Sequence, residues 1–431
     1  MEPIYNDKYK VQMTHQDTPA ARLARIATAS TTCEGVTRLP WTGEHRAALG
    51  QITEWMEDAG LQVTLDAAGT LCGRSPNPGG KPVLMIGSHQ DSVPSGGAFD
   101  GIMGVALGCL AAKALRDDLA GFPFAIEVLA FADEEGVRFP TALIGPRALA
   151  GTLDPAALDM RDGTGQRMRD AMTAFGVEPA GIGALGRDPA SVAGYLEAHI
   201  EQGPVLERHD LPVAAVSAIC GIARHEVTIR GETGHAGTVP MAGRRDALVA
   251  AARVIAAISE AAEGQGELRA TVGTLSLRPG AVNAIPSEVR FTLEVRAPED
   301  ALREVFEGDA LARAAAICRA AGCALTTTRT YVQPAAACDP GLTGALETAI
   351  RDSGHAPLTI PSGATHDASA MADLCPIAML FVRCRGGISH RPDEFASDAD
   401  MEVAVRVLAG AIRRLAQDKG RAAGAPTDGR G

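Results

Sequence analysis

The sequence predicts an α/β protein in which a mostly parallel central sheet is interrupted by a separate α+β domain. Three apolar runs, at residues 82–86, 124–131 and 195–200, indicate buried strands, and each is followed by histidine or charged residues. Helical patterns separate these runs, so the strands are expected to be parallel, with their carboxyl ends on one edge of the sheet. Residues 223–332 have the order strand–helix–strand–strand–helix–strand, which is the split βαβ, ferredoxin-like arrangement.

The first part of the parallel-sheet domain is expected to span residues 1–219. Apolar residues at helical spacing predict its helices, and a Gly-rich loop at 87–101 separates the first buried strand from the helix that follows. An alternating stretch before that strand predicts an edge strand. In chain order these elements are helices at 20–29 and 44–60, strands at 61–71 and 82–86, a helix at 102–115, and strands at 124–131 and 195–200.

The inserted domain is expected at 220–332, and the second part of the parallel-sheet domain at 333–419. The Gly-, Ala- and Pro-rich tail at 420–431 is expected to be disordered. The inserted domain has predicted strands at 223–230, 268–277, 288–296 and 324–332, and helices at 244–262 and 301–321. The last part has helices at 341–353, from 367 and at 400–417, and a strand at 376–382.

Composition restricts the possible partners. A chain of 431 residues is too long for one ordinary core, so two domains are expected. A net charge of −12 without any long basic run argues against a nucleic-acid partner. Nine cysteines without a CxxC pair indicate free, mostly buried thiols. Because no apolar run approaches ~18 residues and no signal sequence is evident, a soluble cytoplasmic protein without membrane contact is expected.

Metal-ligand residue types follow the predicted strands. Histidines and carboxylates form a nitrogen–oxygen donor set that suits Zn²⁺ or Mn²⁺, with Co²⁺ or Ni²⁺ possible. Two ions need a bridging carboxylate, which Asp100 is placed to provide. Asp91 follows His89 by two residues and is placed to orient its ring. Of two adjacent glutamates, one can bind metal while the other acts as general base. The set is His89, Asp91, Asp100, Glu134, Glu135, His199 and His390.

Each of these residues also has an ordinary explanation when it is taken alone. A lone histidine is usually a surface or core residue, adjacent glutamates usually face solvent, and aspartates in a Gly/Ser loop usually cap turns. The repeated order of apolar strand and ligand-type residues favours the metal site over these explanations.

Five short motifs resemble those of one known group of enzymes. They are the HxD at 89–91 with Asp100 in GGAFDG, DEEG at 133–136, HIEQG at 199–203, GHAGT at 234–238 and GGISH at 386–390. Together they resemble the dinuclear-metal aminoacylase/carboxypeptidase superfamily of metallopeptidase architecture. Within it they are most similar to the amidase branch of N-carbamoyl-L-amino-acid hydrolases, β-ureidopropionases and allantoate amidohydrolases. The resemblance runs from about residue 35 to 415. It implies a catalytic domain and an inserted lid domain that also forms a homodimer contact.

The resemblance implies roles for the ligand-type residues. His89 and His199 would hold one divalent ion, Glu135 and His390 the second, and Asp100 would bridge the two. Glu134 would be the general base, and Asp91 would support His89. A histidine at position 199 resembles the ureido-cleaving branch, whereas aminopeptidase-like relatives have a carboxylate there.

The resemblance also implies substrate-binding residues. His235 would contact the scissile group across the dimer, and Gln202 would contribute an amide. Asn283 and Arg296 would bind the substrate carboxylate, a role that suits the planar guanidinium fork of an arginine. Gly363 belongs to SGATHDA, which matches a family SGAGHDA element, and Thr365 departs from it by replacing a glycine. Two further positions stand apart: His366 is expected to be structural, and Pro146 replaces a residue that is usually serine in relatives. The remaining histidines are expected at the surface, namely His15, His45, His209, His225 and His355.

The activity that this resemblance implies is hydrolysis of a ureido C–N bond in nitrogen catabolism. The residues EEGVRFP after Glu134 and the VTRLPW segment at 36–41 are more similar to allantoate amidohydrolases, which implies allantoate as substrate and release of ammonia and carbon dioxide. N-carbamoyl-L-amino acids and β-ureidopropionate are the alternatives. Aminoacylase or dipeptidase activity, and a binding protein without catalysis, are hypotheses from other classes.

Overall fold

The computed structural model describes residues 17–77 and 79–424, which form two compact units. The larger unit comprises the chain up to Ser217, Cys338–Ile360 and the residues from His366 onward. The smaller unit comprises Ala218–Ala337 and Pro361–Thr365. The chain therefore leaves the larger unit twice, once for a long insertion and once for a short loop.

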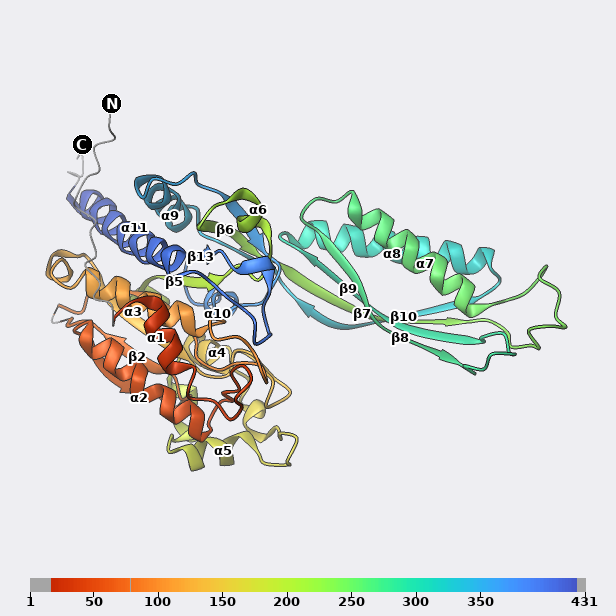
Figure 1. The fold of residues 1–431 in the computed structure, drawn as a ribbon, viewed down its shortest axis with the longest axis horizontal. Coiled ribbons are helices and arrows are strands. Elements are labelled where there is room, and N and C mark those ends of the chain that lie inside the picture. The colour runs from red at the N-terminus through yellow and green to blue at the C-terminus, as the bar shows by residue number, and fades with distance from the viewer. Residues whose placement is uncertain (1–16, 78, 425–431) are drawn as a thin grey trace, which may run out of the picture. The chain divides into compact units, whose positions relative to one another are not determined.

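A mixed sheet runs through the larger unit, and its centre is parallel (Figure 1). β3 (Val83–His89) pairs in parallel with β4 (Ala125–Phe131) and with β5 (Val192–Ile200), and β5 pairs in parallel with β13 (Ile377–Val382). The expected α/β class is therefore confirmed. The strands towards the edges are β1 (Gln62–Leu65), β2 (Leu71–Arg74), β6 (Val213–Ile219), β11 (Ala336–Ala337) and β12 (Thr359–Ser362).

The central strands are apolar because helices cover them. Every residue of β3, β4 and β13 is buried, as is typical of parallel strands between helical layers. Helix α3 packs on these strands and under other helices, so its residues 102–112 are all buried. The helices of this unit are α1 (Pro19–Ile26), α2 (Gly43–Asp58), α3 (Ile102–Ala114), α4 (Ile144–Ala150), α5 (Met168–Phe175), α6 (Val205–His209), α9 (Pro340–Asp352), α10 (Asp367–Met371) and α11 (Asp398–Gly424).

The single edge strand predicted at 61–71 is wrong, because this stretch is a hairpin of β1 and β2. The side chain of Asp66 accepts hydrogen bonds from the backbone N–H groups of Ala68 at 2.8 Å and Thr70 at 2.9 Å. Gly69 has a φ of +88°, which favours glycine. The alternating apolar pattern continues through this turn, so the pattern alone did not reveal it.

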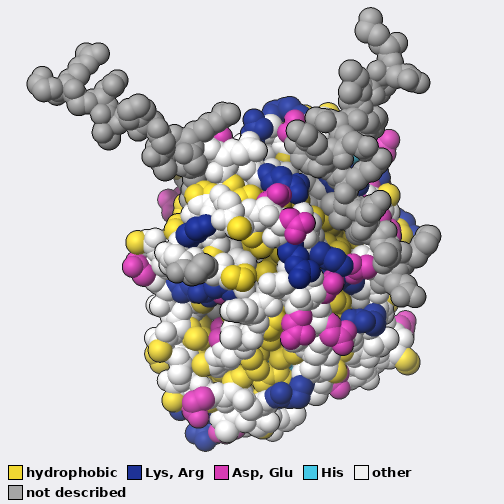
Figure 2. All heavy atoms as spheres, turned by 90° about the vertical axis from the view of Figure 1, so that its left-hand side faces the viewer, with side chains coloured by type: hydrophobic (Ala, Val, Ile, Leu, Met, Phe, Trp, Pro, Cys, Tyr) yellow, Lys and Arg dark blue, Asp and Glu magenta, His cyan; other side chains and the backbone are white. Residues whose placement is uncertain are grey.

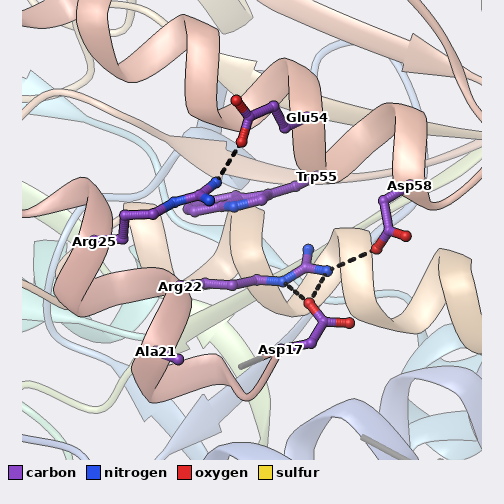
Figure 3. A pocket seen from close by; sticks show the side chains of 7 residues that line it. All are labelled: Asp17, Ala21, Arg22, Arg25, Glu54, Trp55 and Asp58. Carbon is purple, nitrogen blue, oxygen red and sulfur yellow. Dashed lines mark hydrogen bonds and ion pairs between the residues drawn. The ribbon is translucent and has the colours of Figure 1, made fainter. Parts of the chain in front are cut away.

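A buried arginine holds α1 against α2 (Figure 3). Arg22 of α1 is 4% exposed, and it donates to Asp17 at 2.8 Å and to Asp58 of α2 at 3.1 Å. Its guanidinium carbon lies 5.6 Å from the centroid of the Trp55 ring. The adjoining surface cavity of about 220 Å³ is lined by Asp17, Ala21, Arg22, Arg25, Glu54, Trp55 and Asp58. Charge pairs therefore supplement apolar packing where these two helices meet.

The smaller unit is a four-stranded antiparallel sheet with two helices along one face (Figure 1). The strand order is β10-β7-β9-β8. His225 of β7 is buried and lies 2.8 Å from Glu307 of α8, so a surface position for this histidine is wrong. In chain order the elements are β7 (Gly221–Arg230), α7 (Ala247–Glu263), β8 (Arg269–Arg278), β9 (Glu288–Ala297), α8 (Asp300–Ala320) and β10 (Ala324–Gln333).

The surface and the chain end complete the description. Basic and acidic side chains are interspersed on the face drawn in Figure 2. Among the helices described, none is long and apolar enough to cross a bilayer. All nine cysteines are free, and Cys33 is the exposed one. Helix α11 continues to Gly424, so part of the predicted disordered tail is helical, while residues 425–431 lie outside the described residues. Arginine and alanine after position 420 favour this continuation.

Candidate metal centre

The parallel register brings the predicted ligands to one edge of the sheet. His89 is the last residue of β3 and stands opposite Phe131, the last residue of β4. His199 lies one residue before the end of β5 and stands opposite Phe381 of β13. Because the strands are parallel, their carboxyl ends meet at the same edge. The loops that follow β3, β4, β5 and β13 therefore supply the site.

Asp100 reaches back to this edge through a tight turn at Gly101. The N–H of Ile102 donates to the carbonyl oxygen of Asp100 at 2.7 Å, and Gly101 has φ 64° and ψ −64°. These values define a γ-turn that is strained for residues with a side chain. A Cβ on Gly101 would lie 2.3 Å from ring atoms of His89. Glycine therefore satisfies both the backbone conformation and the close approach to the ligand ring.

Two groups of potential metal ligands share Asp100. One is His89, Asp100 and His199, and the other is Asp100, Glu135 and His390, with the ligand atoms of each group within 4.8 Å of one another. Oδ1 of Asp100 lies 3.0 Å from Nε2 of His199 and 3.6 Å from Nε2 of His89. Oδ2 lies 3.2 Å from Nε2 of His390. Each carboxylate oxygen thus faces a different ligand group, which is the arrangement of a bridging carboxylate.

The second group is partly open. His390 is exposed and has a φ of +58°, in the left-handed region that is uncommon for residues other than glycine. Its Nε2 lies 3.9 Å from Oε2 of Glu135, whose Oε1 is buried and has no hydrogen-bond partner. Gln202, with a φ of +55°, donates to Oδ2 of Asp100 at 2.9 Å. A buried carboxylate oxygen without a partner, among histidine and aspartate ligands, fits a divalent cation.

Asp91 has a different set of contacts from the one expected. Nδ1 of His89 is 3.0 Å from the backbone carbonyl of Asp91 and 3.8 Å from its carboxylate. The carboxylate accepts the N–H groups of Glu134 at 3.2 Å and Glu135 at 3.3 Å. Asp91 therefore supports the His89 ring through its main chain and holds the two glutamates through its side chain.

Electrostatics distinguish the carboxylates of the site. Burial raises the pKa of Glu134 well above its usual range, and its Oε2 lies 3.9 Å from Nε2 of His89. Burial, with the charge of Asp100 nearby, raises the pKa of Glu135 to about 7. Burial alone would raise the pKa of Asp100 too, but the imidazoles of His199, His390 and His89 hold it well below its usual range. A basic Glu134 beside an ionised Asp100 is the pairing that a general base and a metal bridge need.

Sequence reasoning missed the residues that connect these loops. Glu394 is buried, and its Oε1 accepts the N–H groups of Phe99 and Asp100, each at 3.0 Å. Ser389 lies 2.9 Å from Oδ2 of Asp100 and 3.0 Å from Oε2 of Glu394. The only signal for Glu394 was its place four residues after His390. His366 is buried, and its ring centroid lies 4.4 Å from that of His199.

The other predicted substrate-binding residues lie in the smaller unit. His235 and Asn283 are exposed on adjacent loops, joined by a hydrogen bond of 2.8 Å from the N–H of Ala236 to the carbonyl of Asn283. Arg296 donates from Nε to Glu294 at 2.7 Å and from Nη1 to the carbonyl of Gly363 at 2.5 Å.

Thr365 is half-buried in the same unit as Arg296 and Gly363. Pro146 is a buried residue of α4. The structure offers no reason for proline rather than serine at this position.

Comparison with known proteins agrees with this geometry. The model of Peptidase family M20/M25/M40 matches residues 85–414, which contain every ligand-type residue named above. The chain belongs to this family. Of its curated relatives, the N-carbamoyl-L-amino acid amidohydrolase of Geobacillus stearothermophilus is 41% identical, over 89% of this chain and 94% of that protein. The allantoate deiminase of Arabidopsis thaliana is 36% identical, over 90% of this chain and 80% of that protein.

The M20 fold also appears among solved structures. The crystal structure of an amidase of the hydantoinase/carbamoylase family from Burkholderia multivorans superimposes with a TM-score of 0.85 at 32% identity. It covers 92% of this chain and 97% of the other. The resemblance that the motifs indicated is therefore confirmed at the level of the family and of its amidase relatives.

Proposed function

We propose that this M20 family member is a metal-dependent amidohydrolase that cleaves the ureido C–N bond of a small ureido acid. The observation that carries the proposal is the pair of ligand groups that share Asp100, with Glu134 beside them. The names of the relatives support the substrate class, because both describe enzymes that act on ureido acids. The enzyme therefore belongs to the hydrolases that act on C–N bonds other than peptide bonds.

Two divalent ions would be held by the two ligand groups. His89 and His199 would bind one ion, Glu135 and His390 the other, and Asp100 both. When bound, such ions activate water and polarise a carbonyl oxygen as Lewis acids. Imidazole and carboxylate ligands suit Zn²⁺ or Mn²⁺, and also accommodate Co²⁺ or Ni²⁺.

Glu134 would act as the general base. Burial raises its pKa above the usual range, which makes the carboxylate a stronger proton acceptor than an exposed glutamate. It would take a proton from the attacking water, whose oxygen bonds to the carbamoyl carbon, and deliver that proton to the departing nitrogen. Ammonia then leaves, and the remaining carbamate yields carbon dioxide. Asp91 would hold Glu134 in place through the N–H contact described above.

Substrate recognition would use the residues that the motifs assign to substrate binding. Gln202 would contact the substrate beside Asp100, and His235 would donate to the oxygen that gains negative charge. The carboxylate at the far end would bind to Asn283 and Arg296, with Gly363 and Thr365 forming the adjoining wall. After its bonds to Glu294 and Gly363, the guanidinium of Arg296 keeps N–H groups on both Nη atoms for a ligand.

Dimerisation and location are parts of the same proposal. The smaller unit would act as a lid and as the contact between two copies of the chain. Its strand β8 lies at the edge of the sheet, where unpaired backbone groups are available to a second copy. A cytoplasmic location is supported by the nine free thiols.

The substrate within this class is proposed to be allantoate or an N-carbamoyl-L-amino acid. Allantoate is favoured by the segments near Glu134 and at 36–41, and the N-carbamoyl acids by the higher identity of 41% to the Geobacillus protein. Ammonia release from allantoate, N-carbamoyl-L-amino acids and β-ureidopropionate, and amino-acid release from N-acetyl-amino acids, each with Mn²⁺ or Zn²⁺ added, decide between them. Release of amino acids from N-acetyl substrates alone would refute ureido cleavage.

Glu134→Gln tests the mechanism. It removes the base without changing the size of the side chain, so kcat should fall by roughly 10²–10⁴-fold while bound metal is unchanged. Glu57→Gln makes the same change on the exposed face of α2 and serves as control. A Glu134→Gln enzyme with near-normal turnover would rule out this residue as the base.

A further inference from the structure

The segment Val36–Trp41 lies against the loops that carry the candidate ligands. The backbones of Val36 and Gly96 exchange two hydrogen bonds, at 2.9 and 2.8 Å. Farther along, the carbonyl oxygen of Pro40 accepts from Arg138, three residues after Glu135, at 2.6 Å. One short stretch of chain thus contacts both the loop after β3 and the loop after β4. The sequence analysis had used this stretch only for its similarity to allantoate amidohydrolases.

Arg38 is the centre of this segment and is 1% exposed. Its Nε donates to the carbonyl oxygen of Gln90 at 2.6 Å, between His89 and Asp91 in the chain. Nη1 donates at 3.2 Å to each of two carbonyl oxygens near the end of α1, those of Ile26 and Ala29. The backbone of Arg38 also bonds with Ser92 in both directions, at 3.0 and 3.1 Å. The guanidinium therefore joins α1 to the loop after β3.

The positive charge of Arg38 has an unusual environment. Among the described residues, no carboxylate lies within ion-pairing distance of it, so carbonyl oxygens solvate the charge. Burial lowers the pKa of Arg38 to about 10, against the opposing effect of the Asp91 charge, so the group is a cation at neutral pH. Burying a cation costs free energy of folding unless nearby negative or polar groups offset that cost. The acid that it faces is Asp91, which is itself 0% exposed.

Asp91 connects Arg38 to the residues of the candidate metal centre. Its carboxylate accepts the N–H groups of Glu134 and Glu135, and its carbonyl oxygen contacts Nδ1 of His89. These contacts connect Asp91 to the candidate base Glu134 and to two candidate ligands, Glu135 and His89. Arg38 fixes the backbone on both sides of Asp91, at Gln90 and at Ser92, and supplies the opposite charge.

We propose that Arg38 is a positioning residue of the metal centre, acting through Asp91 on the placement of His89, Glu134 and Glu135. The described hydrogen bonds of Arg38 go to Gln90, Ile26, Ala29 and Ser92, and none of them is to a candidate ligand atom. Removal of its charge leaves the buried Asp91 carboxylate uncompensated and frees the Gln90 carbonyl. Both changes loosen residues on either side of the centre. This inference rests on the proposed metal centre and does not depend on which substrate the enzyme hydrolyses.

The test compares Co²⁺ binding by the metal-free full-length protein in four forms. They are the wild type, Arg38→Met, Arg38→Lys and the control Arg22→Met. Arg22 is also a buried arginine of the larger unit, but it bonds to Asp17 and Asp58, away from the ligand loops. Affinity is measured by chelator competition and site geometry by the visible absorption of bound Co²⁺, with urea unfolding measured in parallel.

Arg38→Met should weaken Co²⁺ binding by roughly 10–100-fold and alter the absorption bands, since supports of metal ligands typically have effects of this size. Arg22→Met should lower stability without changing either readout. Arg38→Lys keeps the charge without the fork and should recover part of the affinity. Combined with Asp91→Asn, Arg38→Met should add little further loss if it acts through Asp91.

The inference would be overturned if Arg38→Met kept the Co²⁺ affinity and absorption spectrum of the wild type. It would also be overturned if Arg22→Met lost as much Co²⁺ affinity as Arg38→Met. If Arg38→Met does not fold, Arg38→Lys is decisive, because wild-type affinity and spectrum in that folded variant would equally overturn it. A wild-type protein that binds no Co²⁺ would instead refute the proposed metal centre.

Discussion

Gly101→Ala is the sharpest single test of the candidate metal centre. The substitution adds one methyl group next to the ring of His89 and changes no charge. Gly101 has a φ of +64° and closes the γ-turn that returns Asp100 to the sheet edge. The added Cβ would lie 2.3 Å from the His89 ring. The substitution therefore affects at once Asp100, the proposed bridging carboxylate, and His89, a proposed ligand.

The structure gives the size of the effect. An L-residue in this backbone conformation costs roughly 1–3 kcal/mol. Carbon atoms in contact prefer separations of about 3.5 Å or more, so the ring and the methyl group must separate by about 1 Å more. A misplacement of about 1 Å at a reacting centre typically costs on the order of 10²-fold in rate. We therefore expect kcat to fall about 100-fold, with a loss of stability of about 2 kcal/mol.

Gly80→Ala separates the two contributions. Gly80 has a φ of +61° and no heavy atom within 4 Å of an added Cβ, so it bears the backbone cost without the contact. Urea unfolding should show a loss of stability in both variants, larger in Gly101→Ala because the contact with His89 adds to the backbone cost, whereas kcat and Co²⁺ affinity should fall in Gly101→Ala alone. Equal kcat and Co²⁺ affinity in the two variants would refute the argument that the His89 ring needs this space.

Two further predictions concern other parts of the chain. Glu294 holds Arg296 at 2.7 Å and Arg224 at 2.6 Å, so Glu294→Gln should raise KM for ureido acids about threefold to tenfold with kcat unchanged. The carboxamide analogue of the substrate should show no change, nor should the exposed control Glu226→Gln; a rise in KM for the amide as well would contradict the prediction. Burial lowers the pKa of His45 to about 3, so between about pH 6.5 and 3 the unfolded chain holds a proton that the folded chain lacks. Stability should fall as pH falls through this window, by about 1.4 kcal/mol per unit. Urea unfolding at pH 7 and at pH 5 gives the free energy of unfolding that is lost between the two pH values. This loss should be about 2 kcal/mol smaller in His45→Asn than in the wild type, and equal losses would be evidence against a role for His45.

Strand ends were readable from sequence because they combine two local signals. An apolar run that is followed by His89 or Glu134 indicates both a buried strand and the polar residues at its carboxyl end. The structure places these groups together with Asp100 because parallel strands share an edge. The contacts of Glu394 with Asp100 join positions far apart in the chain, so no local pattern contains them. The same holds for the contact of Arg38 with Gln90.

Other differences follow from competition between local and tertiary effects. Asp91 was assigned to the His89 ring on spacing and on the family resemblance, whereas its carboxylate accepts hydrogen bonds from the amides of another loop. Strand β6 has the sequence VAAVSAI, in which small residues weaken both helical and strand periodicity, and it was not predicted. His45 and His225 were expected at the surface because buried partners are not visible in a sequence. Each is buried beside a hydrogen-bonding group of its own unit.

The points where the chain leaves and re-enters the larger unit are adjacent. The N–H of Cys338 donates to the carbonyl of Ser217 at 3.0 Å, so the long insertion between them begins and ends at one backbone hydrogen bond. In engineering terms the insertion is a cassette: a tight turn of a few residues is long enough to replace it. The ligand groups all lie outside the cassette. The candidate ligand residues and the loops around His235 are therefore separable in the sequence, and only the short segment Pro361–Thr365 belongs to the smaller unit while lying outside the cassette.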